Sequence, residues 1–124
     1  MSKVTIYHNP RCGTSRNVLA LINATTAELE VIEYLKTPPS KEQLAKLVAD
    51  SGLAIRDFMR QKESLYQEND LGNAKWSDEE LLDWMVKEPI LMNRPVVVTE
   101  VGTRLCRPKE VLFEILPAAK AADN

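Results

Sequence analysis

The chain has few of the residues that cross-link small domains. Its 124 residues include two cysteines, one histidine and four glycines. Cys12 and Cys106 lie far apart, form no CxxC pair and have no partners at a zinc-ligand spacing. This pattern argues against a disulfide scaffold and against a metal site. A chain of this length buries about two-thirds of the surface that it exposes when unfolded, so its stability requires neither cysteine.

Long apolar segments and a net positive charge are also absent from the sequence. The longest unbroken apolar run, Val18 to Ile22, is far too short to cross a bilayer, and the first ten residues contain no apolar core of a signal peptide. We therefore expect a cytoplasmic protein with reduced thiols and no membrane partner. The net charge of −2 argues against a nucleic-acid partner. Residues 1–27 nevertheless contain three basic side chains and no acidic one, as a small-anion site requires.

The hydrophobic pattern of the first third predicts a strand, a helix and a second strand. Residues 3–7 and 29–35 are rich in β-branched, aromatic and alternating apolar residues. Between them, an N-cap at Thr14 or Ser15 precedes an apolar helical stripe. This order predicts a right-handed parallel crossover. The stripe consists of Val18, Leu21 and Ile22.

A helical insert follows the second predicted strand. Capping boxes begin at Ser40 and Ser77, and the helices that they open are expected to end before Gly52 and at Lys87. A shorter helix is expected at residues 55–60. The residues predicted to face inward are Leu44, Leu47, Val48, Leu81, Leu82, Met85 and Val86.

The last quarter of the chain predicts two strands and a helix. The strands are expected at residues 95–99 and 103–106, on either side of a turn at Gly102, and a last helix has Pro108 at or near its first position. The complete order is βαβ, a helical insert between strands 2 and 3, and ββα. We interpret it as an α/β sandwich in a single domain, residues 1–124. The predicted buried face of the last helix is Val111, Leu112, Ile115 and Leu116.

Cys12 lies at the turn between the first predicted strand and helix. Free backbone N–H groups and the helix dipole favour negative charge there, which lowers a thiol pKa and attracts an anion. A phosphatase loop needs arginine where this chain has Val18, and a dithiol oxidoreductase needs cysteine where it has Ser15. A single attacking thiol remains, and its resolving thiol is either Cys106 or that of a separate molecule such as glutathione.

Three segments resemble the signatures of the glutaredoxin-dependent arsenate reductases. They are YHNPRCGTSRN at residues 7–17, NRPVVVT at 93–99 and GTRLCRP at 102–108. The resemblance implies a thioredoxin-like fold and a reaction in three steps. The Cys12 thiolate attacks arsenate to form a covalent thioarsenate, glutathione attacks that adduct, and glutaredoxin releases arsenite. Glutathione is then a co-substrate, and no cofactor is bound.

The resemblance also implies roles for particular side chains. It places the nucleophile on Cys12, a helper histidine on His8 and a cis peptide bond before Pro95. Guanidinium groups suit a tetrahedral oxyanion because they bind its oxygens in pairs and neutralise its charge. The implied anion-binding residues are Arg60, Arg94 and Arg107.

Other residues keep simpler or alternative interpretations. Ser15 is expected to cap the helix or to hydrogen-bond the thiolate. Cys106 becomes a bystander if Arg107 is a ligand, because neighbouring residues of an extended segment face opposite ways. Two alternative functions are another thiol oxidoreductase of the same fold, for example a glutathione-linked one, and a redox-sensing regulator that binds RNA polymerase through a CxxC switch. We expect ordinary surface roles for Arg11, Arg16 and Arg104, and packing roles for Trp76 and Trp84.

Overall fold

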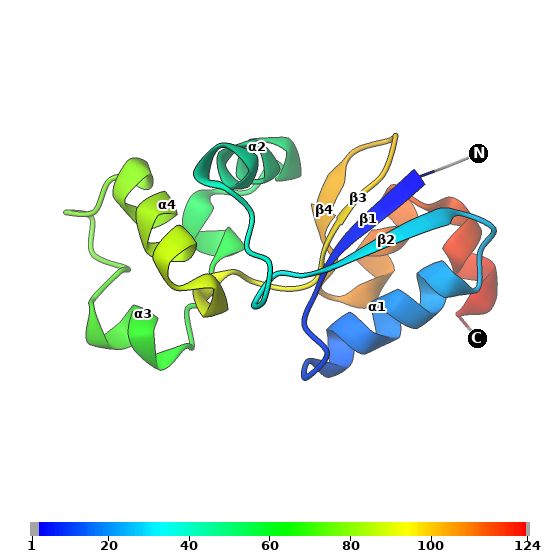
Figure 1. Ribbon diagram of the computed structural model, residues 1–124, viewed down its shortest axis with the longest axis horizontal. Helices are drawn as coiled ribbons and strands as arrows, with labels where there is room; N and C mark the ends of the chain where they lie inside the picture. The colour runs from blue at the N-terminus through cyan, green and yellow to red at the C-terminus, as the bar shows by residue number, and fades with distance from the viewer. Residues whose placement is uncertain (1–2, 124) are drawn as a thin grey trace. The chain divides into compact units, whose positions relative to one another are not determined.

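The computed structural model describes residues 3–123, which divide into two compact units (Figure 1). The first contains the described residues up to Thr37 together with those from Arg94 onward, and the second is Pro38–Asn93. The helical insert expected from the sequence is thus a unit with its own interior. That both units belong to one domain stays a prediction.

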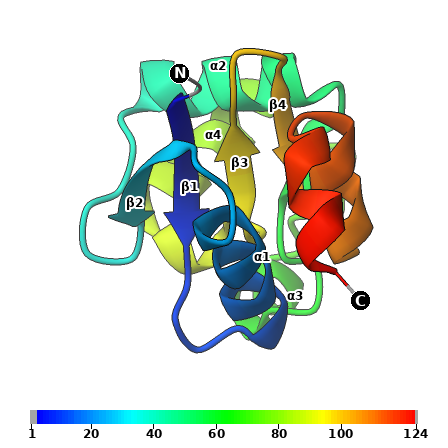
Figure 2. The same ribbon diagram turned by 90° about the vertical axis from the view of Figure 1, so that its right-hand side faces the viewer.

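The first unit is built on a four-stranded sheet with strand order β2-β1-β3-β4 (Figure 2). β1 (Lys3–His8) runs parallel to β2 (Glu28–Glu33), and α1 (Gly13–Asn23) connects them. β1 also pairs antiparallel with β3 (Val96–Val98), which pairs antiparallel with β4 (Thr103–Leu105). The predicted parallel crossover and the following strand pair are therefore confirmed, and this sheet brings the start of α1 close to the ends of the β3–β4 pair.

One hydrophobic core joins the sheet to α1 and to two 3-10 helices, η3 (Lys109–Glu114) and η4 (Pro117–Ala122). The apolar stripe predicted for the first helix is buried in it, as expected. Apolar burial of this kind contributes about 25 cal/mol per Å² to folding. The core residues are Val4, Ile6, Val18, Leu21, Ile22, Val97, Cys106, Leu112, Ile115, Leu116 and Ala119.

The second unit is almost entirely helical. Both predicted capping boxes are present, at Ser40 with Gln43 and at Ser77 with Glu80. Gly52 ends its helix with a φ of 75°, a left-handed conformation that glycine adopts without steric cost. The helices of this unit are α2 (Lys41–Ser51), η1 (Ile55–Phe58), α3 (Ser64–Glu68), α4 (Asp78–Lys87) and η2 (Pro89–Leu91).

The start of α1 differs from the prediction. Its N-cap is Cys12, with extended backbone angles, rather than Thr14 or Ser15. Ser15 lies one turn inside the helix and is fully buried, where its hydroxyl binds groups of the preceding loop instead of capping the helix. This shift places the cysteine itself at the helix N-terminus.

Two predicted elements end two residues earlier than expected, whereas β3 and β4 each end one residue early. β2 ends at Glu33 instead of residue 35, because the backbone N–H groups of Lys36 and Thr37 both donate to the Glu33 carbonyl and turn the chain. The helix predicted at 55–60 is a 3-10 turn that ends at Phe58. Its extension is prevented because Met59 pairs with Met92 in an isolated β-bridge.

The remaining differences concern helix type and side-chain exposure. The predicted last helix is divided into two 3-10 helices, η3 and η4, because Pro117 has no backbone N–H to donate the hydrogen bond that would continue η3. Pro108 is the N-cap of η3 and not its first residue. The short α3 was not predicted, since five residues give no readable period. Val86 is exposed because Leu81, Leu82 and Met85 already occupy the buried face of α4. Val48 and Val111 are only half-buried.

No helix within residues 3–123 is long and apolar enough to span a lipid bilayer.

The capping box at Ser40 gives a stability prediction. Its hydroxyl accepts a hydrogen bond from the Gln43 backbone N–H at 3.2 Å. The Ser40 backbone N–H in turn donates to the Gln43 side-chain oxygen at 3.0 Å. Ser40→Ala removes the acceptor and is expected to lower the free energy of unfolding by about 1 kcal/mol, measured by urea unfolding. Ser40→Asp keeps an acceptor and serves as the control. Equal losses in both variants contradict the assignment.

Candidate active site

Cys12 is the residue around which the candidate site is built. It follows the loop that leads from β1 into α1 (Figure 2). Its backbone N–H donates to the Asn9 carbonyl and its carbonyl accepts from Arg16, both at 3.0 Å. The side chain is 8% exposed. The thiol therefore sits at a helix N-terminus, largely shielded from water but still accessible, which is the position that favours a reactive thiolate.

Two arginines from the C-terminal part of the first unit act on this thiol. Arg107, just after β4, donates from Nη1 to Cys12 Sγ at 3.3 Å and to the Arg94 carbonyl at 3.2 Å. Arg94 lies just before β3, and its positive charge also acts on Cys12. The Arg94–Pro95 bond is cis, as the resemblance implies, and so is the Arg107–Pro108 bond. Two of the three predicted anion-binding arginines are thus gathered beside Cys12.

The surroundings of Cys12 lower its pKa. Burial by itself raises the pKa of a thiol, because it disfavours the charged form. Here the backbone N–H of Ser15, the hydrogen bond from Arg107 and the positive charges of Arg94 and Arg107 outweigh that effect and hold the pKa below the usual cysteine value. This shift increases the fraction of the thiol that is present as the nucleophilic thiolate.

His8 and Ser15 form a buried network behind Cys12. His8 Nδ1 and Ser15 Oγ lie 2.7 Å apart, and Ser15 Oγ also accepts the Asn9 backbone N–H at 3.1 Å. Burial lowers the pKa of His8, the negative charge of Glu33 raises it and the positive charge of Arg16 lowers it, with a net decrease. Ser15 thus serves Cys12 through its backbone N–H, while its hydroxyl is used by His8 and Asn9.

Asn9 is a residue of this network that the sequence analysis missed. It is 5% exposed, and besides its bonds to Ser15 and Cys12 its side-chain Oδ1 accepts the Arg11 backbone N–H at 3.0 Å. The signal was present in the Asn-Pro pair, since an asparagine side chain commonly binds the backbone N–H two residues later. Asn9 fixes the loop that carries the thiol.

Cys106 has the opposite environment. It is fully buried in the hydrophobic core, and its Sγ lies 3.7 Å from the Arg104 carbonyl. Burial, with the negative charge of Glu114, raises its pKa to about 12 despite the nearby charge of Arg104. The side chain of its neighbour Arg107 points the other way and reaches Cys12, as expected for consecutive residues of an extended segment. Neither cysteine forms a disulfide.

The remaining arginines named from the sequence have separate surroundings. Arg60 belongs to the second unit, where its side chain lies 3.8 Å from Glu63 and its backbone N–H donates to the Leu91 carbonyl; its part in an anion site stays a prediction. Arg16 is exposed but donates to the Pro10 carbonyl at 2.9 Å. Arg104 pairs with Glu114 at 3.1 Å.

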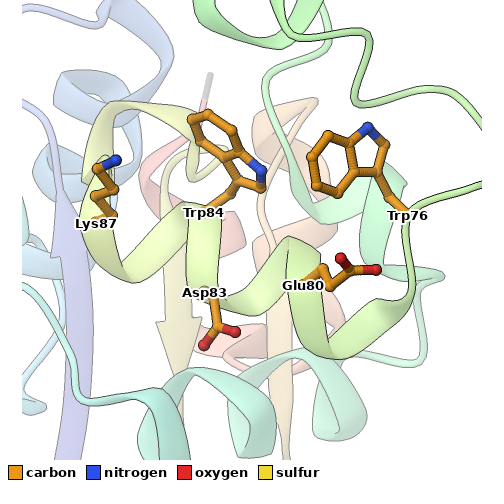
Figure 3. Close-up of a pocket in the computed structure, with 5 residues that line it drawn as sticks. All are labelled: Trp76, Glu80, Asp83, Trp84 and Lys87. Carbon is orange, nitrogen blue, oxygen red and sulfur yellow. The ribbon is translucent and has the colours of Figure 1, made fainter.

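A separate pocket of about 240 Å³ opens on the second unit (Figure 3). Its two indole rings, Trp76 and Trp84, pack edge to face with centroids 6.0 Å apart. Its carboxylates have structural partners, because Glu80 belongs to a capping box and Asp83 lies 2.9 Å from Lys41. The lining residues are Trp76, Glu80, Asp83, Trp84 and Lys87. It holds no nucleophile, so the candidate active site is the one at Cys12.

No metal centre accompanies either location in the part of the chain that the structure describes. Among residues 3–123, no group of three or more histidine, cysteine, aspartate or glutamate side chains is placed to hold an ion.

The fold defines a thioredoxin-like protein, and Cys12, with its lowered pKa, is its candidate reactive thiol. Comparison with known proteins gives the same result. The model of the ArsC family matches residues 7–115. The arsenate reductase of Escherichia coli strain K12 is 52% identical over 120 residues, which cover 97% of this chain and 85% of the relative. The arsenate reductase of Rhizobium meliloti is 55% identical over 114 residues, 92% of this chain and 81% of the relative.

A solved structure extends the likeness to three dimensions. The arsenate reductase from Vibrio cholerae superposes with a TM-score of 0.87 at 44% identity, covering 91% of this chain and 97% of that one. The chain belongs to the ArsC family. The resemblance noted in the three sequence segments and the expected thioredoxin-like fold are thereby confirmed.

The contrast between the two thiols gives a titration prediction. Cys12 is expected to lose its proton below the usual cysteine pKa, and Cys106 only near pH 12 or on unfolding. Ultraviolet thiolate absorbance against pH measures both steps, and Cys12→Ser removes the lower one. Arg107→Gln shifts the lower step upward because it removes a donor and a positive charge, while Arg104→Gln is the control. Two thiols that titrate together contradict the assignment.

Proposed function

We propose that this chain reduces arsenate to arsenite and that Cys12 is the nucleophile. The observation that carries the proposal is the low-pKa thiol held 3.3 Å from the Arg107 guanidinium, with the charge of Arg94 beside it. A thiolate and an oxyanion repel each other unless positive charge lies between them, and two guanidinium groups supply that charge. The relatives named arsenate reductase support the choice of arsenate as the anion.

The first step forms a covalent adduct. The Cys12 thiolate attacks arsenic, an As–S bond forms, and an As–O bond breaks so that hydroxide leaves and takes up a proton to become water. Arg94 and Arg107 bind the remaining oxygens. The family resemblance names Arg60 as a third anion-binding residue, and we extend the proposal to it on that ground alone.

The second stage transfers two electrons to arsenic from thiols outside the chain. Glutathione displaces an arsenic-bound hydroxyl, which leaves as water, and forms a second As–S bond. A glutaredoxin thiol then attacks the glutathione sulfur, so that these two external thiols become one disulfide, and the electron pair of the broken As–S bond takes arsenic from the +5 to the +3 state. Water finally breaks the bond between arsenic and Cys12, which releases arsenite and restores the Cys12 thiol. Cys106 is unsuited to supply the second thiol, because it is fully buried and burial raises its pKa to about 12. Dependence on glutathione favours a cytoplasmic location, because the cytoplasm keeps thiols reduced.

His8 and Ser15 support this chemistry without touching the substrate. Ser15 presents its backbone N–H to the thiolate, and the bonds of its hydroxyl to His8 and Asn9 hold it in that position. The same contacts argue against a CxxC-type regulator. Ser15 occupies the position of the second cysteine, and its hydroxyl is hydrogen-bonded to His8 and Asn9.

The two cysteines are predicted to differ in function. Cys12→Ser is expected to abolish arsenate-dependent NADPH consumption in a mixture of glutathione, glutathione reductase and glutaredoxin. Cys106→Ser, which removes only a buried thiol, is expected to keep it. A folded but inactive Cys106→Ser protein contradicts the use of external thiols, and a wild-type protein without arsenate-dependent turnover contradicts the proposed substrate.

The arginines are predicted to act through their geometry as well as their charge. Lysine keeps the charge but loses the planar pair of donors. Arg94→Lys and Arg107→Lys are therefore each expected to lower kcat by about 10²–10³-fold, the usual effect of removing one donor from an oxyanion site. Arg11→Lys, at an exposed position, is the matched control. Activity within a few-fold of wild type in either test variant contradicts the assignment.

A further inference from the structure

Glu33 lies beside His8 on the neighbouring strand, outside the site described so far. The parallel register of β1 and β2 pairs His8 with Glu33, just as it pairs Val4 with Leu29. Since side chains alternate along a strand, Leu29, Val31 and Glu33 share one face of the sheet with Val4 and His8. That face carries the hydrophobic core and α1, because Val4 and Leu29 both pack there. Glu33 is thus the carboxylate at the end of this row.

The charge of Glu33 remains available to act on His8. Its own ion pair with Lys36 is long, 3.6 Å, and both side chains are well exposed, 42% and 79%, so that pair is weak and screened by water. The charges that act on the His8 imidazole come from Glu33 in β2 and Arg16 in α1. The carboxylate and the guanidinium act in opposite directions on the imidazole.

We propose that Glu33 is a positioning residue for the reaction, and that it acts on the Cys12 site through His8 and Ser15. This inference rests on the proposed function, in which His8 and Ser15 support the Cys12 thiolate. Glu33 favours the protonated imidazole and so opposes the effects of burial and of Arg16. Without it, His8 takes up a proton only at lower pH.

The protonation of His8 matters because a fully protonated imidazole can only donate from Nδ1, whereas the neutral ring donates or accepts there according to its tautomer. Ser15 Oγ already accepts the Asn9 N–H, and it has one proton and one further lone pair to offer. When His8 Nδ1 carries no proton, the Ser15 hydroxyl donates to it. When His8 is protonated, Nδ1–H donates to Ser15 Oγ, and the Ser15 hydroxyl points its own proton toward another acceptor. Glu33 therefore biases the direction of the hydrogen bond that holds Ser15 in place, and the backbone N–H of Ser15 donates to the Cys12 sulfur.

The test uses the fact that His8 is the only histidine in the chain. Its ring-proton NMR signals report its titration without ambiguity, in wild type and in Glu33→Gln. We expect the His8 pKa to fall in Glu33→Gln and to rise in Arg16→Gln. Both changes should shrink at high salt, because the charges act partly through water. Glu33→Asp keeps the charge and should restore a titration close to wild type.

Glu30→Gln is the matched control. It removes the same charge from the same strand, but Glu30 is paired with Thr5 on the opposite face and acts on Tyr7. Its His8 titration should coincide with wild type. The pH profile of kcat/KM for arsenate reduction gives the second measurement, in which the inflection at the His8 pKa should move downward in Glu33→Gln and stay in place in Glu30→Gln.

Three results overturn the inference: an unchanged His8 titration in Glu33→Gln, an equal change in Glu30→Gln, or a shifted titration with an unshifted pH profile. If Glu33→Gln does not fold, the opposite shift in Arg16→Gln and the titration of Glu33→Asp still decide it. The NMR titration needs no arsenate. A wild-type protein that shows the expected titration but reduces no arsenate therefore contradicts the proposed function and leaves the effect of Glu33 on His8 intact.

Discussion

A single guanidinium nitrogen, Nη1 of Arg107, connects the parts of the site. It contacts Cys12 Sγ at the start of α1 and the Arg94 carbonyl at the start of the β3–β4 pair. A thiolate that is only 8% exposed loses most of its hydration, and this loss must be offset by donors and positive charge from the protein. The backbone N–H of Ser15 is a local contribution. The arginines come from the C-terminal part of the chain, and the sheet order that places β3 beside β1 and β4 beside β3 brings them to the site.

The two cysteines show how strongly surroundings determine thiol chemistry. Cys12 and Cys106 are both buried and both free. Hydrogen-bond donors and positive charges beside Cys12 outweigh the effect of burial and lower its pKa. Cys106 lies among apolar side chains, and burial raises its pKa to about 12. Cys106 and Arg107 are adjacent in the sequence, and alternation along the segment is enough to put one in the core and the other at the site. Burial alone is therefore a poor guide to which thiol reacts.

Local patterns in the sequence predicted more of the structure than long-range contacts did. The capping boxes, the glycine at the end of α2 and the stripe of α1 depend on residues within one or two turns, and they were found correctly. The N-cap at Cys12 and the early end of η1 were missed because the loop network and the Met59–Met92 bridge decide them. The contact of Arg107 with Cys12 spans 95 residues, so only the family resemblance could suggest it. The loop network around Asn9 was readable in part from its Asn-Pro pair.

In the proposed reaction, the same donor serves two successive charges. In the resting protein Arg107 Nη1 stabilises the Cys12 thiolate. When the As–S bond forms, sulfur loses its negative charge and becomes a weaker hydrogen-bond acceptor. The oxygens of the adduct still carry negative charge, and the guanidinium can donate to them. The donor can then turn from sulfur to oxygen without any movement of the backbone. Stabilisation that passes from the nucleophile to the adduct in this way lowers the barrier more effectively than tight binding of free arsenate, because it strengthens as the bond forms.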